Sequence, residues 1–128
     1  MSGLARSFIA FGALNLAVAV ALDAAARHAW QNALSIPSAA EWFQAGLRYH
    51  QLHALGLICV GVIWPHCGKR WLAAAGGLML IGIALFSVNL YLRSLAGFHD
   101  FHAWVPLGGT AYILSWLSLA VGALVRAD

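Results

Sequence analysis

The stretch that decides the fold is Trp71-Leu-Ala-Ala-Ala-Gly-Gly-Leu-Met-Leu-Ile-Gly-Ile-Ala-Leu-Phe-Ser-Val-Asn-Leu-Tyr-Leu92, which contains no Asp, Glu, Lys or Arg. About 20 mainly apolar residues in a helix cross the hydrocarbon core of a bilayer. A helix satisfies its own backbone hydrogen bonds, which lipid cannot do for it. The stretch therefore predicts a membrane-spanning helix over residues 71–92.

Working outward, residues 8–26 and 105–125 are further apolar runs of spanning length. A fourth run is strongest only from Leu52 to Trp64, which is too short alone. Ser38-Ala-Ala-Glu41 has the spacing of a capping box, in which Ser38 and Glu41 satisfy each other's backbone N–H groups. We therefore expect one long helix over residues 39–64, ended by Pro65.

Composition agrees with this pattern. The chain of 128 residues is 62% hydrophobic and 9% charged, whereas soluble domains average about 45–50% apolar and about 25% charged residues. We expect one domain over residues 1–128, an all-α integral membrane bundle of four transmembrane helices. An alternative for residues 8–26 is a cleavable signal peptide that ends in an alanine cluster. Against it, Asp23 and Arg27 lie where the residues around a signal-peptide cleavage site are neutral and small.

The cations predict orientation rather than a ligand. The net charge of the chain is +3, and its Lys and Arg residues form no cluster of the kind that binds nucleic acid. Four of them fall on one side of the predicted membrane: Arg6, Lys69, Arg70 and Arg126. Because cytoplasmic loops carry an excess of Lys and Arg, we expect both termini on the same side, in the cytoplasm.

Small residues recur along the last span at steps of three or four: Gly108, Ala111, Ser115, Ser118 and Gly122. Such a stripe lets helix backbones approach closely in lipid. We interpret it as a packing face, for this bundle or for a partner. Asn15 and Asn89 are polar residues deep in the predicted membrane spans, and they predict hydrogen bonds between helices. Asp23 and Arg27 are four residues apart and predict an ion pair.

Ionisable groups inside a membrane are functional candidates. Tyr49 and His53 share a helical face, and His53 is either a buried, hydrogen-bonded ring or part of a polar, proton-accepting pocket. His50/His53 and His99/His102 have the spacing that can hold one transition metal, although the Cys-containing motifs of structural zinc sites are missing.

The sequence contains no nucleophile elbow, phosphate-binding glycine loop or paired carboxylates, so we expect no enzyme activity. Cys59 and Cys67 make no disulfide framework.

Three stretches also resemble a known family: Phe43-Gln-Ala-Gly46-Leu-Arg-Tyr49-His-Gln-Leu-His53, Leu85-Phe86-Ser87-Val-Asn-Leu90-Tyr91, and Pro106-Leu-Gly108-Gly109-Thr-Ala-Tyr-Ile-Leu-Ser-Trp116. In order and spacing they are similar to the domain-of-unknown-function family 423, which includes the YgdD-like bacterial inner-membrane proteins and, more distantly, transmembrane protein 256. The resemblance implies a small four-span inner-membrane protein with no established activity.

Position by position, the resemblance favours His28, Tyr49 and His53 as one shared polar site at the external mouth of the bundle, with Gly46 and Gly109 among the other matching residues. The chain departs from the family pattern at His50, where glutamine is usual, and His99 and His102 match no motif of the family. These departures weaken a metal site built on all the external histidines.

Three functions are compatible with these observations. The first is a structural or accessory membrane component that packs against lipid or another membrane protein. The second is a membrane protein that binds a metal ion or small ligand at the external His/Tyr cluster. The third is a subunit of a homo-oligomeric, proton-coupled transporter or channel.

Overall fold

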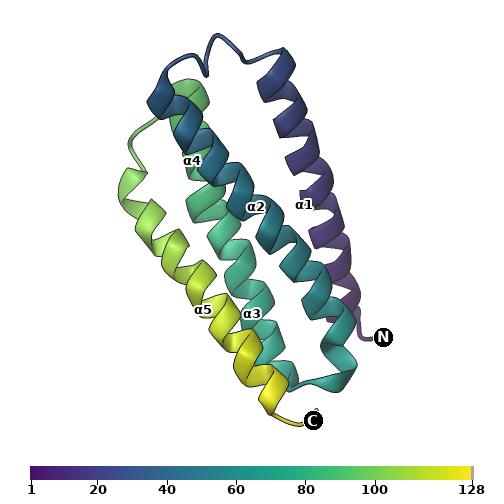
Figure 1. Ribbon diagram of the computed structural model, residues 1–128. Helices are drawn as coiled ribbons and strands as arrows, with labels where there is room; N and C mark the ends of the chain where they lie inside the picture. The colour runs from purple at the N-terminus through teal and green to yellow at the C-terminus, as the bar shows by residue number, and fades with distance from the viewer. Residues whose placement is uncertain (128) are drawn as a thin grey trace.

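The computed structural model describes residues 1–127 and folds them into four helical rods (Figure 1). The rods are α1 (Gly3–His28), α2 (Pro37–Ile63), a continuous rod made of α3 (Lys69–Gly82), η2 (Ile83–Val88) and α4 (Asn89–Ala96), and α5 (Val105–Leu124). Two 3-10 turns, η1 (Trp64–His66) and η3 (His102–Trp104), lie between rods. The predicted all-α, four-helix architecture is confirmed.

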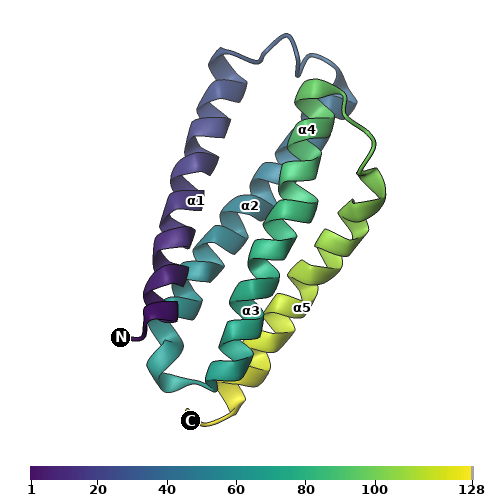
Figure 2. The ribbon, with the colours of Figure 1, turned by 180° about the vertical axis from the view of Figure 1, so that it is seen from behind.

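Figures 1 and 2 show the N- and C-terminal ends of the described chain at the same end of the bundle. The turn between η1 and α3 meets the end of α5 there, since the Gly68 N–H donates to the Gly122 carbonyl at 2.9 Å. The expectation of both termini on one side is met, and Arg6, Lys69, Arg70 and Arg126 all belong to this end.

The start of α2 corrects one expectation. The helix begins at Pro37, and its N-cap residue Ile36 makes no side-chain capping bond. The capping box of Ser38 and Glu41 is therefore wrong. The physical reason is that Pro37, whose backbone angle suits the first helical position, starts the helix one residue before Ser38, so Ser38 lies inside the first turn and not at the N-cap. The Glu41 carboxylate is consequently exposed and uncommitted within residues 1–127.

Three helical rods are long and apolar enough to cross a membrane: Gly3–His28, Lys69–Ala96 and His102–Leu124. The helix α2 is of similar length but carries polar side chains in its first half. It is nevertheless enclosed by the bundle, because it packs against α1, α3, η2 and α4. Its buried polar side chains, His50 and His53, face other helices, which is where an intramembrane polar group can be satisfied, whereas Glu41, Gln44 and Arg48 are exposed.

Glycines set the closest helix crossings. A Cβ on Gly12 would lie 2.6 Å from the Ala54 carbonyl oxygen, so α1 and α2 touch backbone to backbone. A Cβ on Gly108 would lie 2.5 Å from the Phe86 backbone nitrogen, which brings α5 equally close to η2. The segment η2 is a π-helical turn, a local widening that often accompanies functional sites.

The predicted stripe on α5 faces inward. Gly108, Ala111, Ser115 and Gly122 are buried and Ser118 is half-buried. A Cβ on Gly122 would lie 3.0 Å from Trp71 Cβ of α3. Gly46 lies at a second crossing, where its Cβ would meet Leu90 and Tyr91 at 3.2 Å. These small residues pack the chain against itself.

Candidate functional site

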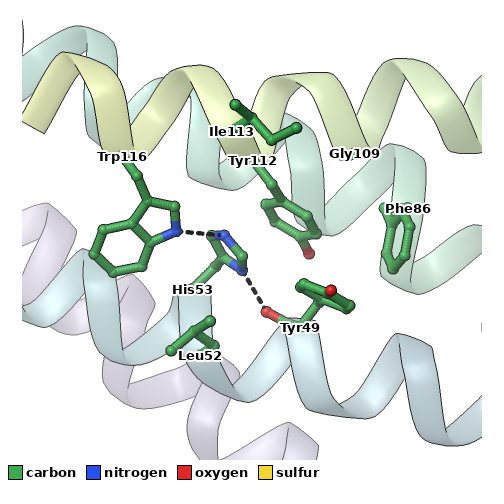
Figure 3. A pocket seen from close by; sticks show the side chains of 8 residues that line it. All are labelled: Tyr49, Leu52, His53, Phe86, Gly109, Tyr112, Ile113 and Trp116. Atoms are coloured by element: carbon green, nitrogen blue, oxygen red, sulfur yellow. Dashed lines mark hydrogen bonds between the residues drawn. The ribbon is translucent and has the colours of Figure 1, made fainter.

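A pocket of about 350 Å³ opens between α2, η2 and α5 (Figure 3). It is lined by Tyr49, Leu52, His53, Phe86, Gly109, Tyr112, Ile113 and Trp116. Its walls are mainly aromatic, and none of these side chains carries a fixed charge. Pockets of this kind, apolar with a few convergent polar groups, are the usual form of small-ligand sites.

The ring of His53 is held by two hydrogen bonds, drawn in Figure 3. Its Nδ1 lies 2.6 Å from the Tyr49 carbonyl oxygen, and its Nε2 lies 2.8 Å from Trp116 Nε1. A carbonyl only accepts and an indole N–H only donates. His53 is therefore the neutral ring with its proton on Nδ1, and Nε2 accepts from Trp116.

The His53 ring also stacks on Tyr112, with centroids 3.5 Å apart and planes at 16°. Tyr112 is in turn fixed by Ser87 of the π-helical turn, since their hydroxyl oxygens are 2.8 Å apart. A Cβ on Gly82 would lie 2.2 Å from the Tyr112 ring, so glycine there makes room for it. The fold thus positions the back wall of the pocket rigidly.

Tyr49 forms the more open wall. Its ring packs edge-on against Phe86 at 5.2 Å and near-parallel to Tyr112 at 6.0 Å. The side chain is 41% exposed, and its hydroxyl makes no hydrogen bond within residues 1–127. Figure 3 places the Tyr49 and Tyr112 hydroxyls between His53 and Phe86, where a ligand in the pocket would reach them.

The pocket lies at membrane depth and opens sideways. His50, one turn from His53, bonds to Asn15, which is at the middle of the 26-residue helix α1. Trp116 is close to the middle of α5. The rim residues Leu52 and Ile113 are 48% and 64% exposed, as side chains that face lipid are. The mouth of the pocket therefore lies on the apolar outer surface of the bundle.

Comparison with known proteins shows the family to which the chain belongs. Residues 22–109 match a family described as "Protein of unknown function (DUF423)". The chain belongs to the DUF423 family. The match runs from the end of α1 to Gly109 at the start of α5, and so includes most of the pocket.

Curated relatives match the DUF423 chain over nearly its whole length. It is 37% identical to "UPF0382 membrane protein YwdK" of Bacillus subtilis, over 93% of this chain and 97% of the relative. It is 35% identical to "UPF0382 membrane protein SSP2132" of Staphylococcus saprophyticus, over 91% and 96%. It is 26% identical to "UPF0382 inner membrane protein YgdD" of Escherichia coli, over 93% and 90%. No solved structure matches. The DUF423 chain is thus a multi-pass protein of the bacterial membrane.

A second histidine of the DUF423 chain, His50, serves a separate network. Its Nδ1 lies 2.9 Å from the Tyr91 hydroxyl and its Nε2 lies 2.9 Å from Asn15 Oδ1. The Asn15 Nδ2 donates to the Phe11 carbonyl, which fixes the amide orientation. His50 therefore donates from Nε2 and joins α1, α2 and α4. The bond between helices expected of Asn15 is present, but Asn89 Nδ2 donates at 2.6 Å to the carbonyl of Phe101, which lies in the loop between α4 and η3 and not in a neighbouring helix.

The other predicted residues lie elsewhere. His28 is exposed in the last turn of α1 and does not line the pocket of Tyr49 and His53. His99 packs edge-on against Trp42, with centroids 5.9 Å apart, and His102 Nδ1 contacts the His99 carbonyl. The Asp23–Arg27 pair is formed at 3.2 Å.

The four histidines proposed for a metal do not converge. His50 and His53 are three residues apart but point to different neighbours, and both nitrogens of each ring already have partners. Within residues 1–127, no three His, Cys, Asp or Glu side chains form a group that could hold a metal ion. The physical reason is that a three-residue step rotates the side chain by about 60° around the helix, enough for His50 to meet α1 and α4 and for His53 to meet α5.

Sequence reasoning did not assign several lining residues to the site, and Tyr112 is the most central of them. It contacts His53, Tyr49 and Phe86 together. Its spacing from Gly108 and Trp116, four residues each way, places the three on one face of α5. This spacing was visible in the sequence, but it indicates a site only once α5 is known to pack against α2.

Proposed function

We propose that this protein is a non-enzymatic accessory component of the inner membrane that binds a neutral, amphipathic, membrane-dissolved ligand in the pocket between α2, η2 and α5. The observation that carries the proposal is the free Tyr49 hydroxyl in an aromatic pocket that opens to lipid at membrane depth. A hydroxyl without a partner in an apolar medium is costly. A ligand with one hydrogen-bonding group and an apolar body would satisfy it.

The chemistry of the lining supports binding rather than catalysis. Both nitrogens of His53 are held by protein groups, so the ring serves as a fixed wall. With His53 neutral and no carboxylate or cation in the lining, nothing there complements a charged headgroup. A neutral molecule is therefore the better fit.

A partner protein docked on the small-residue stripe is the less favoured form of an accessory role. Gly108, Ala111, Ser115 and Gly122 are buried inside the chain itself and are not available to a neighbour. Lipid-facing contact through the pocket is what the exposed rim of Leu52 and Ile113 supports.

We also propose that the end carrying both termini is cytoplasmic. It carries Arg6, Lys69, Arg70 and Arg126, and positive charge in short loops favours the cytoplasmic side. A reporter that is active only in the cytoplasm, fused at residue 1, tests this. Activity of a periplasm-specific reporter at the same position would contradict it.

The binding proposal is tested with a photoactivatable hexadecanol, a neutral molecule with one hydroxyl, in membranes that contain the protein. Mapping the labelled peptides should place the label on residues 49–53 and 109–116. Gly109→Leu fills the pocket, because a Cβ there lies 3.8 Å from Phe86 and meets no backbone. We expect it to lower labelling about tenfold, equivalent to roughly 1.4 kcal/mol of binding free energy.

Gly77→Leu is the matched control. Gly77 is a helical glycine with nothing within 4 Å of its Cβ, and it lies outside the pocket. It should label as the unaltered chain does. Even labelling around the whole bundle, or equal labelling of Gly109→Leu and Gly77→Leu, would refute the pocket as a binding site.

A further inference from the structure

A second surface, on the outer face of α2, has the polarity of a phospholipid. Its polar members follow each other at steps of three and four residues: Glu41, Gln44, Arg48 and Gln51. We call this set the α2 polar strip. It occupies the first half of the helix, and Leu52, Leu55 and Val62 take over the exposed face beyond it.

Two open hollows meet this strip, and Arg48 borders both. The first, of about 350 Å³, is lined by Ala40, Glu41, Gln44, Ala45 and Arg48. The second, of about 450 Å³, is lined by Arg48 and Gln51 with the apolar side chains Leu16, Val20, Leu52 and Leu55 of α1 and α2. Polarity therefore falls in one direction, from the α2 N-terminus towards the middle of the membrane.

Arg48 has no partner of its own. It forms no ion pair or hydrogen bond within residues 1–127, and it is exposed. It lies two residues, about 3 Å of helix rise, from His50, which bonds to the middle of α1. A guanidinium at that depth is costly unless its side chain extends towards the headgroups and finds an anion there. Arginine suits a phosphate because its planar fork donates two parallel hydrogen bonds.

Glu41 supplies the complementary charge. The carboxylate is exposed and uncommitted, since the capping box that would have used it does not form. It lies seven residues, about 10 Å of helix, from Arg48 on the same face. An arginine side chain extended towards Glu41 shortens that separation to one that a phosphate with an attached ammonium can bridge.

We propose that the α2 polar strip binds a zwitterionic phospholipid with a primary ammonium headgroup. The phosphate accepts hydrogen bonds from Arg48, the ammonium donates to Glu41, and an acyl chain lies in the hollow of Leu16, Val20, Leu52 and Leu55. The leaflet is the one at the end of the bundle opposite the termini. The site shares only Leu52 with the pocket of His53, and its polar contacts do not involve that pocket.

A second copy of the chain is the competing occupant. A two-fold axis along the membrane normal would bring the same patch of each copy together. The strip has one cation at its centre, so two Arg48 side chains would face each other without a carboxylate at their level. Charge complementarity favours the lipid.

The test uses nanodiscs of equal parts dioleoyl phosphatidylethanolamine, phosphatidylglycerol and phosphatidylcholine, with the released protein analysed by native mass spectrometry. We expect retained phosphatidylethanolamine to exceed each other lipid by about tenfold, the size of one hydrogen bond between charged groups. Arg48→Gln should lower retention of all three lipids about tenfold. Glu41→Gln should lower the retention of phosphatidylethanolamine to that of the other two lipids, whose own retention should not change because neither has an ammonium N–H that donates to Glu41.

Arg27→Gln is the matched control, since Arg27 is an exposed arginine near the same end that already pairs with Asp23. It should retain phosphatidylethanolamine normally, and so should Gly109→Leu, which separates this site from the pocket. Equal retention of the three lipids by the unaltered chain would overturn the proposal. A lipid-free dimer, or unchanged retention by Arg48→Gln, would overturn it as well.

Discussion

His50 and His53 lie three residues apart on α2, are buried to the same degree, and do different things. His50 joins three helices through Asn15 and Tyr91 and does not line the pocket of His53. His53 bonds to one neighbouring helix through Trp116 and forms the wall of a pocket. The difference teaches that a buried histidine at membrane depth is not by itself a site. What decides is whether its surroundings are closed by side chains or left open to lipid.

The largest expected effect comes from a variant that displaces α5, the helix that contacts His53 but not His50. Gly108→Leu puts a Cβ 2.5 Å from the Phe86 backbone, which cannot yield as a flexible side chain could. We expect α5 to lose its contact with η2, at a cost of about 3 kcal/mol in unfolding free energy. The His53 pocket should be lost while the His50 network persists. Thermal unfolding in detergent measures the loss of stability, and labelling by the photoactivatable hexadecanol measures the loss of the pocket.

Gly109→Ala is the control for that variant, because its Cβ meets only the Phe86 ring, at 3.8 Å. It should unfold as the unaltered chain does. A Gly108→Leu protein of normal stability would mean that α5 does not dock where the structure places it.

The next effect tests whether His50 is structural. His50→Leu leaves the Asn15 amide and the Tyr91 hydroxyl without their partner. Each lost bond inside a membrane is worth about 1 kcal/mol, so we expect a loss of about 2 kcal/mol. His50→Gln, the residue that the family resemblance favours at this position, can donate to Asn15 and accept from Tyr91. It should keep most of the stability.

Unfolding in a graded detergent series compares the two variants. If His50→Gln were as unstable as His50→Leu, the bridge to Asn15 and Tyr91 would not be what His50 contributes.

The comparison also shows how far the sequence reaches. Three spans followed from apolar runs of about the length that the bilayer needs, whereas the apolar run of α2 was too short alone. Pro65 ended α2 as expected, since η1 begins at Trp64. The start of α2 was missed because two N-terminal signals competed, and the ring of Pro37 prevailed over the Ser38 hydroxyl. Local chemistry alone did not rank them.

The site was predicted in part. Tyr49 and His53 share a face because of helical spacing, and they line one pocket with residues of α5, at membrane depth and not at the external mouth of the bundle. His28 was grouped with them on its side of the membrane only, and sharing a side does not mean sharing a pocket. Trp116 and Tyr112 reach His53 through the packing of α5, which depends on glycines such as Gly108 and on the π-helical turn at Ser87. No periodicity in the sequence predicts that turn.

A smaller effect is expected at His53. His53→Phe keeps an aromatic ring against Tyr112 and removes only the acceptor for the Trp116 indole and the donor to the Tyr49 carbonyl. Trp116 is 37% exposed, and the Tyr49 carbonyl lies within a helix, so neither group is left fully stranded. We expect a loss of about 1 kcal/mol, half that of His50→Leu. An equal loss of unfolding free energy in His53→Phe and His50→Leu, measured in the same detergent series, would contradict the distinction between a histidine that joins three helices and one that lines a pocket.

The last prediction needs no substitution, because the protonation of the two histidine rings can be compared in the unaltered chain. His53 must carry its proton on Nδ1, since Nε2 accepts from the Trp116 indole. His50 must carry a proton on Nε2, since Asn15 Oδ1 only accepts, and in the neutral ring Nδ1 then accepts from the Tyr91 hydroxyl. Nitrogen NMR of chain labelled at histidine, assigned with His50→Gln, should therefore find opposite tautomers three residues apart. The same tautomer at both positions would mean that one of the two rings is turned, and the pocket wall or the three-helix bridge would have to be redrawn.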